Sequence, residues 1–223
     1  MAIVVAIDGP SGSGKSSVSR GVARELGLRY LDTGAQYRAM TWWILQNGID
    51  PADPSAIALA AAKPLIVSGT DPVAPSITVD GTDVAEVIRS GEVTAAVSKV
   101  ASVQAVRDRL IALQRELIAH ASEHCGGIVA EGRDIADVVY PAAEAKIYLT
   151  ASPAARAARR GAELGAQAGP AERTEAELAR RDAEDAKTTR PLEAAPGATV
   201  VDATELDLEQ VIAKVARLVS VAR

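Results

Sequence analysis

The apolar positions of this chain fall into two alternating patterns. Short runs rich in apolar residues predict buried strands at 3–7, 28–31, 128–130, 146–150 and 199–202. Helical periodicity predicts helices among them at 16–26, 35–46, 103–122 and 208–221. Because strands that alternate with helices form parallel sheets covered on both faces, we expect an α/β fold of three layers (α/β/α) with a mainly parallel central sheet.

Residues 63–83 interrupt this alternation. Asp80-Gly81 stands within alternating apolar and polar residues, and Asp-Gly in that setting is a strong hairpin signal. Short helices are expected on either side, at 51–62 and 92–101. The segment therefore predicts a small antiparallel sheet within an inserted subdomain.

The segment 161–173 carries the signals of a loop. It contains Gly165, Gly169 and Pro170 and has no clear apolar face. Ser152 is placed to cap the helix before it, and residues 175–187 resume a helical pattern. We expect a flexible excursion between two helices.

The first strand runs directly into a glycine-rich loop. Residues 9–16, GPSGSGKS, fit G-x-x-x-x-G-K-[ST] at every fixed position, and a helix follows. Glycines let the backbone approach a ligand, so the N–H groups of the loop and of the helix start form an anion site. Lys15 adds a positive charge for the β- and γ-phosphates, and the Ser16 hydroxyl is placed to ligate Mg²⁺. A glycine-rich turn that binds nothing is the alternative, but the strand–loop–helix context favours a site for a nucleoside triphosphate.

Other polar residues also follow predicted strands. Asp32, residues 131–134 and Thr150 all stand at carboxyl ends, where ligands collect in parallel sheets. Moving a phosphoryl group between two polyanions requires cationic clamps, and arginines supply them. We expect this role for the arginines at strand-end loops or beside the excursion, namely Arg38, Arg133, Arg156 and Arg181. Two more, Arg159 and Arg180, are expected to be solvated surface charges.

Composition limits the partners of the chain. Its net charge of −5 argues against general binding to nucleic acids or anionic membranes. Cys125 is the only cysteine, and no apolar run approaches the ~20 residues needed to span a bilayer. We expect a cytoplasmic protein that acts as a monomer, with neither nucleic acid nor membrane as a partner.

The chain resembles bacterial cytidylate kinases, members of the nucleoside monophosphate kinase group. The P-loop alone is generic, but its combination with DTGAQYR and EGRDI is specific. The matching segments run in order over nearly the whole chain: IDGPSGSGKS at 7–16, LDTGAQYR at 31–38, VDGTDVAEVIR at 79–89, VTAAVSKVAS at 93–102, EGRDIADVVYP at 131–141, KIYLTAS at 146–152, RRDAEDA at 180–186 and VVDAT at 200–204.

The resemblance implies three working parts and two nucleotide sites. The parts are a P-loop core at 1–35 and 101–223, a monophosphate-binding insertion at 36–100, and a lid at about 155–187 within the core. The implied ATP site comprises Gly9, Pro10, Ser11, Gly12, Ser13, Gly14, Lys15, Ser16 and Ser17. The implied CMP site comprises Thr33, Tyr37, Arg38, Ser98, Arg107, Arg133, Asp134, Arg181, Asp185, Lys187 and Arg190. The implied catalytic residues are Lys15, Arg133, Arg156, Arg160 and Arg181.

Within the CMP site the resemblance gives each group a task. Ser98, Arg107 and Asp134 would face cytosine, a base with one amino donor and two acceptors that such a set complements. Arg181 and Asp185 would hold the ribose, and the two arginines at strand ends would grip the acceptor phosphate.

One segment departs from the family pattern. The family reads R-D-x-x-D-S-x-R-x-x-S-P-L where this chain has RDAEDAKTTRPL, so Ala186 replaces the serine and Thr188 the arginine. Lys187 or Arg190 would then replace the missing cation. A lysine would supply a point charge without the bidentate fork of arginine.

The sequence therefore predicts transfer of the γ-phosphoryl group of MgATP to CMP, and to dCMP. A P-loop kinase for uridylate or a metabolite is the nearest alternative, and the set at 98, 107 and 134 argues against it. A regulatory GTPase or ATPase switch is a further alternative, but no N-K-x-D guanine motif is present. A module that only binds nucleotide is the third.

Overall fold

A five-stranded parallel sheet forms the centre of the protein. The structure is a computed structural model, and it describes residues 2–165, 170–189 and 192–222. The strand order is β2-β6-β1-β7-β8, and every neighbouring pair is parallel. The strands are β1 (Ile3–Asp8), β2 (Arg29–Asp32), β6 (Gly127–Gly132), β7 (Ala145–Thr150) and β8 (Thr199–Asp202). All five strands expected from the apolar runs are confirmed, but β8 is not a buried strand: only Val201 is buried, because β8 lies at the edge of the sheet.

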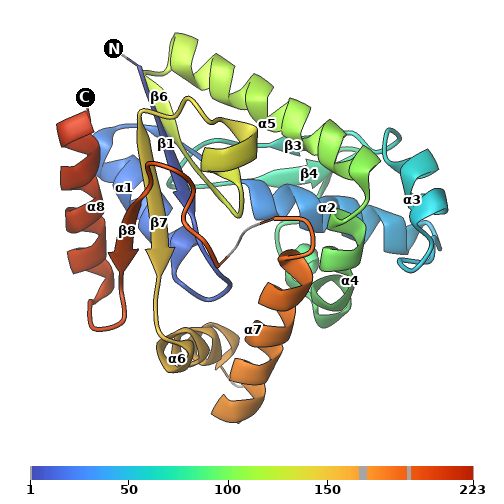
Figure 1. The fold of residues 1–223 in the computed structure, drawn as a ribbon. Helices are drawn as coiled ribbons and strands as arrows, with labels where there is room; N and C mark the ends of the chain where they lie inside the picture. The colour runs from blue at the N-terminus through green and yellow to red at the C-terminus, as the bar shows by residue number, and fades with distance from the viewer. Residues whose placement is uncertain (1, 166–169, 190–191, 223) are drawn as a thin grey trace.

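Helices cover both faces of this sheet, as Figure 1 shows. Side chains of β1 alternate between the faces, as a strand with a two-residue repeat requires. Ile3, Val5 and Ile7 belong to one hydrophobic cluster, whereas Val4 and Ala6 belong to another. The first cluster packs against α1 and α8, and the second packs against α5. The bounds are α1 (Lys15–Leu26), α5 (Gln104–His124) and α8 (Leu208–Ala222). The predicted three-layer α/β/α fold is confirmed.

A second, antiparallel sheet of order β3-β4-β5 has its own core. Asp80 and Gly81 form its tight turn with φ of 51° and 81°, the positive values that a two-residue hairpin turn requires. The hairpin signal is therefore confirmed. This part comprises α2 (Thr33–Gln46), α3 (Pro54–Ala60), β3 (Ile66–Ser68), β4 (Ile77–Val79), β5 (Thr82–Asp83), the 3₁₀ turn η1 (Val87–Arg89) and α4 (Gly91–Ala101). Its core also takes in Val106 and Leu110 of α5, so that helix packs in both parts of the protein.

Helices α6 (Pro153–Leu164) and α7 (Ala171–Asp185) pack against each other beyond the carboxyl ends of the strands (Figure 1). The expectation of a flexible excursion over 161–173 is wrong for most of its length, because α6 continues through Leu164 and α7 starts at Ala171. Gly161 costs an α-helix only about 1 kcal/mol, and the alanines and arginines around it favour one. Residues 166–169 lie outside the described part of the chain.

One element was not predicted from the sequence. A short π-helical turn, η2 (Ile135–Val139), follows β6 after Arg133 and Asp134. It packs its apolar residues against the α5 face of the sheet. Among the described residues, no helix is both long enough and apolar enough to cross a membrane.

Candidate functional site

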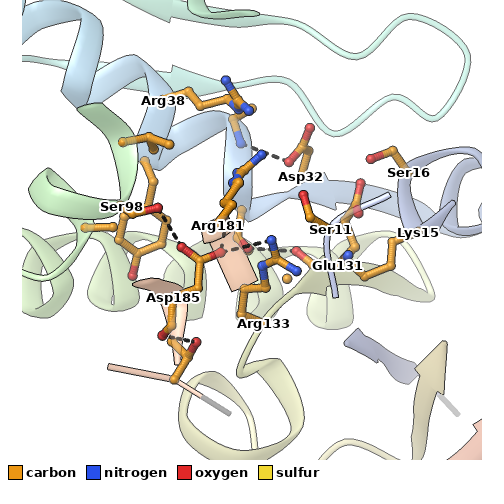
Figure 2. Close-up of a pocket in the computed structure, with 18 of the residues that line it drawn as sticks. Ser11, Lys15, Ser16, Asp32, Arg38, Ser98, Glu131, Arg133, Arg181 and Asp185 are labelled. Atoms are coloured by element: carbon orange, nitrogen blue, oxygen red, sulfur yellow. Dashed lines mark hydrogen bonds and ion pairs between the residues drawn. The ribbon is translucent and has the colours of Figure 1, made fainter. Parts of the chain in front are cut away.

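A cavity of about 480 Å³ opens at the carboxyl ends of the parallel strands. Its walls come from the P-loop, the part that contains the antiparallel sheet and the α6–α7 pair, and Figure 2 shows these side chains pointing into one space. Predicted site residues on its walls are Ser11, Gly12, Gly14, Lys15, Ser16, Ser17, Thr33, Tyr37, Arg38, Ser98, Arg107, Arg133, Asp134, Arg160, Arg181 and Asp185. The structure thus brings together residues from six of the eight matching segments, whereas the described segments 146–152 and 200–204 contribute none to the cavity wall.

A few predicted site residues lie elsewhere. Gly9, Pro10 and Ser13 belong to the P-loop but do not line the cavity. Lys187 is exposed and pairs with Glu184, its Nζ 2.7 Å from the carboxylate oxygen. Arg190 lies outside the described residues. Where the family pattern has an arginine, Thr188 lines the cavity.

The P-loop takes the conformation that its glycines allow. A Cβ atom on Gly9 would lie 2.0 Å from the carbonyl oxygen of Leu149, so the neighbouring strand admits no side chain there. Gly14, with φ of 91°, precedes α1, and no described side chain caps this helix start. Its first N–H groups therefore remain for a ligand. Lys15 curls back over the loop and donates from Nζ to the carbonyl of Pro10 at 2.7 Å.

Arginines of α6 hold the P-loop from outside the cavity. Arg156 is buried, and its Nη1 donates to the carbonyl of Ser11 at 3.0 Å and pairs with Asp182. The N–H of Ser11 donates to the same carboxylate at 2.9 Å. Arg159, one helical turn on, donates to the carbonyls of Ser13, at 3.2 Å, and Ala203. These contacts fix the carbonyls of the loop away from the cavity.

The expectation that Arg159 is a solvated surface charge is wrong. Its side chain is half-buried and bonded to two backbone carbonyls. Residues three apart on a helix share a face, so Arg159 follows Arg156 toward the P-loop. Arg180 is exposed, as expected.

A buried ion pair stands on the opposite side of the cavity. Arg107 Nη2 lies 2.6 Å from Asp134 Oδ2, and each side chain is 10% exposed. Tyr37 lies beside them, and burial together with the charge of Asp134 raises the pKa of its hydroxyl to about 12. The phenol therefore stays neutral and able to donate at physiological pH.

Asp185 joins three parts of the protein (Figure 2). Ser98 of α4 donates its hydroxyl to Oδ1 at 2.7 Å, which links the insertion to α7. Arg133 approaches Oδ2 to 2.9 Å with Nη2, and its Nη1 donates to the carbonyl of Gly9 at 2.8 Å. The Arg133 guanidinium thus bridges the P-loop and α7.

Among the described residues, cations outnumber carboxylates on the cavity wall. The cationic residues are Lys15, Arg20, Arg38, Arg89, Arg107, Arg133, Arg160 and Arg181. The acidic residues are Asp32, Glu131, Asp134 and Asp185. The clustering is strong enough to oppose protonation: burial and Arg181 lower the pKa of Arg38 to about 9, and burial and Arg133 lower that of Arg181 to about 10. In a chain of net charge −5, this local excess of positive charge suits a polyanion.

Three carboxylates at strand ends were not among the site residues assigned from the sequence. Glu131 accepts from the Tyr30 hydroxyl at 2.5 Å, and burial, followed by the charge of Asp32, raises its pKa. Asp32 caps α2 by accepting from the N–H of Ala35 at 2.9 Å. Asp8 accepts from two N–H groups of η2. Only the strand-end position marked the first two, and no local signal marks Asp8.

The model of the cytidylate kinase family matches residues 5–221. A cytidylate kinase of Streptomyces avermitilis is 56% identical over 100% of this chain and 94% of the relative. Those of Streptomyces griseus and Rhodococcus opacus are 57% and 50% identical, over 97% and 98% of this chain and 92% and 95% of theirs. The solved structure of TT1252 from Thermus thermophilus aligns with a TM-score of 0.49 and 19% identity over 97% of each chain. From the family match and the curated relatives, the chain belongs to the cytidylate kinase family.

Proposed function

We propose that this protein transfers the γ-phosphoryl group of ATP to CMP, giving ADP and CDP. One observation carries the proposal: a single cavity has a P-loop on one wall and the Arg107–Asp134 pair on the other. Such a cavity can hold a donor triphosphate and an acceptor base at once. The reaction then needs positioning and charge neutralisation more than covalent chemistry.

On the donor side, the phosphates of ATP bind the N–H groups of the P-loop and the start of α1. Lys15 exchanges the carbonyl of Pro10 for the β- and γ-phosphate oxygens. Burial and the charge of Arg133 lower the pKa of Lys15, and an added anion opposes that shift because it favours the charged ammonium. Arg156 and Arg159 keep the loop in shape from behind, so we assign Arg156 to bracing the loop.

The oxygen groups beside the P-loop fit a magnesium ion. The Ser16 hydroxyl is exposed on the cavity wall, near the carboxylates of Asp32 and Glu131. Hydroxyl and carboxylate oxygens are the donors that Mg²⁺ prefers. These three residues would hold the ion with ATP, and it would neutralise charge on the phosphates.

On the acceptor side, the Asp134 carboxylate accepts from the exocyclic amine of cytosine. Arg107 and Ser98 donate to the acceptor atoms of the base. Uracil carries a carbonyl where cytosine carries the amine, so an acceptor would meet an acceptor. We assign Asp185 and Arg181 to the ribose, and Arg38 and Arg133 to the acceptor phosphate.

The insertion at 36–100 and the lid at about 155–187 would close on the two nucleotides and exclude water. The Ser98–Asp185 contact already joins them. We extend the proposal to dCMP as a second acceptor. Cytoplasmic location and a monomeric state remain predictions.

The test is an assay that couples ADP release to a panel of nucleoside monophosphates with MgATP. We expect CMP to be used with the highest kcat/KM, dCMP to be accepted and UMP to be used poorly. A preference for UMP or a purine monophosphate would contradict the proposal. ADP release that needs no acceptor would favour an ATPase switch instead.

A further inference from the structure

We propose that Asp8 is a positioning residue for base selection, because it caps the turn that follows Asp134 and so leaves the Asp134 carboxylate for the acceptor base. The inference rests on the proposed function, in which Asp134 reads cytosine. Asp8 is the last residue of β1 and directly precedes the P-loop.

Both oxygens of Asp8 accept hydrogen bonds from the start of η2. Oδ1 accepts from the N–H of Ile135 at 2.9 Å, and Oδ2 accepts from the N–H of Ala136 at 2.8 Å. Both bonds are buried, and Asp8 is 5% exposed. The first N–H groups of a helical turn have no partners within it, so a carboxylate that accepts two of them stabilises the turn.

Asp134 occupies the N-cap position of η2, the residue whose side chain ordinarily caps such a turn. It directly precedes Ile135, yet its side chain makes no capping hydrogen bond. Aspartate is among the most favoured residues at that position, because its carboxylate reaches the N–H groups two or three residues on. Here the Asp134 carboxylate pairs with Arg107 and lines the cavity. Asp8 supplies from a neighbouring strand the cap that Asp134 does not.

Asp32 shows the ordinary arrangement in the same sheet. It ends β2 and caps its own helix, accepting from the N–H of Ala35 at 2.9 Å. Of these two aspartates that directly precede a helical turn at the cavity, only Asp134 has its cap made by another residue. Because Asp8 caps η2 in place of Asp134, the Asp134 carboxylate is available to the acceptor pocket.

Gly9, the residue after Asp8, contacts the segment around Asp134 on its N-terminal side. The carbonyl of Gly9 accepts from Arg133 Nη1 at 2.8 Å. Asp8 at the end of β1 and Gly9 at the start of the P-loop therefore tether both flanks of Asp134, through Ile135 after it and Arg133 before it. The position of Asp134 is thus set by the end of β1.

Loss of one acceptor oxygen at Asp8 should free an N–H group of η2. In Asp8→Asn the side chain keeps its shape, but its NH₂ group faces an N–H group, and donor meets donor. The carboxylate of Asp134, at the N-cap position of η2, is an available replacement acceptor. If Asp134 turns to cap η2, it leaves Arg107 and the base.

The experiment compares Asp8→Asn, Asp134→Asn and the double variant with the wild-type protein. Asp53→Asn is the matched control, since Asp53 Oδ1 also accepts from two backbone N–H groups, at 3.0 Å each, at the exposed start of α3. The measurements are kcat/KM for CMP and for UMP, KM for ATP, and hydrogen exchange at the amides of Ile135 and Ala136.

We expect Asp8→Asn to lower the CMP-to-UMP ratio of kcat/KM roughly tenfold, within the range that one matched base contact supplies. KM for CMP should rise while KM for ATP stays within about twofold, and exchange at the two amides should accelerate. Asp53→Asn should change none of these. The double variant should have a CMP-to-UMP ratio no lower than that of Asp134→Asn alone, because both substitutions act through the same contact with the base.

An unchanged ratio in folded Asp8→Asn overturns the inference. So do equal losses for CMP, UMP and ATP, or losses that add in the double variant. In each case Asp134→Asn still tests base reading separately: if it leaves the ratio unchanged, the proposed role of Asp134 fails as well.

If Asp8→Asn does not fold, the wild-type protein gives the answer by titration. Burial, with a contribution from the charge of Asp134, raises the pKa of Asp8 to about 6, against its two backbone hydrogen bonds and the charge of Lys15. Tyr148 of β7 also faces Asp8. The CMP-to-UMP ratio cancels the titration of the phosphate that both acceptors share. It should fall as the pH drops through about 6, and a constant ratio across that range overturns the inference.

Discussion

Arg107 and Asp134 face each other across 2.6 Å, and only 10% of each side chain is exposed. They come from α5 and from the second residue after β6, two segments that also line the acceptor side of the cavity. Burying two charges is costly unless each is paired and further bonded. The pair therefore marks a place where the chain keeps charge out of water next to a ligand cavity, which is typical of a functional site.

Replacing Arg107 with lysine should impair CMP use while ATP binding persists. Lysine keeps the charge but loses the planar fork that can donate to Asp134 and the base together. We expect kcat/KM for CMP to fall about tenfold to a hundredfold, with KM for ATP unchanged. Arg109→Lys is the control, because Arg109 is on the same helix but bonds to the carbonyls of Ala61 and Pro64. Equal loss in both variants would contradict a specific role for Arg107.

Removing Lys15 should abolish turnover and spare the fold. The Lys15 Nζ donates to the carbonyl of Pro10, and the side chain is not part of the hydrophobic cluster around α1. Lys15→Ala should therefore leave the thermal unfolding transition near that of the wild type. Loss of this charge beside the transferred phosphoryl group should lower kcat roughly a thousandfold. Lys99→Ala, at an exposed position of α4, provides the control. Near-normal turnover by a folded Lys15→Ala protein would disprove the assignment of the donor site.

Gly9 should tolerate no side chain. A Cβ atom there would overlap the carbonyl oxygen of Leu149 at 2.0 Å, so β1 and β7 would have to separate. Gly9→Ala should lower the free energy of unfolding by about 3 kcal/mol, typical of overpacking. Gly91→Ala is the matched control, because nothing lies within 4 Å of the atom added there, and it should change stability by less than about 0.5 kcal/mol. Denaturant titrations of the two variants measure the difference.

The elements with a continuous local pattern were predicted well from the sequence. Five strands, the P-loop and the Asp80-Gly81 hairpin each depend on residues adjacent in the chain. The helix at 161–164 was missed because glycine and proline nearby were given more weight than the alanines and arginines around Gly161.

What the sequence left out depends on contacts between distant segments. Asp8 and Ile135 are 127 residues apart, and no periodicity links a strand end to a turn on another strand. Arg159 has the same composition around it as a solvated helix face, and only the packing of α6 on the P-loop reveals its partners. The site residues could be listed from motifs, but their tethers could not.

The raised pKa of Asp8 has a consequence for stability. Its pKa, about 6 in the folded protein, lies above the ordinary aspartate value of 3.8, so between these values the folded state binds more protons than the unfolded state. Stability from this group therefore increases as the pH falls from about 6 to 4 and is lost as the pH rises through 6. Two units correspond to about 3 kcal/mol.

Asp8→Asn removes this titration. The measured quantity is the free energy of unfolding of the wild type minus that of Asp8→Asn. This difference should increase by about 2 to 3 kcal/mol when the pH is lowered from 7 to 4. Urea titrations at several pH values measure the difference, in which other titrating groups cancel. A difference that does not vary with pH would show that Asp8 ionises normally in the fold.

If Asp134 reads the base, the preference for CMP over UMP depends on its carboxylate. The measurement is kcat/KM for CMP divided by kcat/KM for UMP, in the wild type and in Asp134→Asn, with KM for ATP as the internal control. Asparagine keeps the shape but can turn its NH₂ group toward the carbonyl of uracil. We predict that the ratio falls about tenfold to a hundredfold while KM for ATP holds. A ratio within about twofold of the wild type would contradict the account, and Asp134 would then serve to hold Arg107 in place.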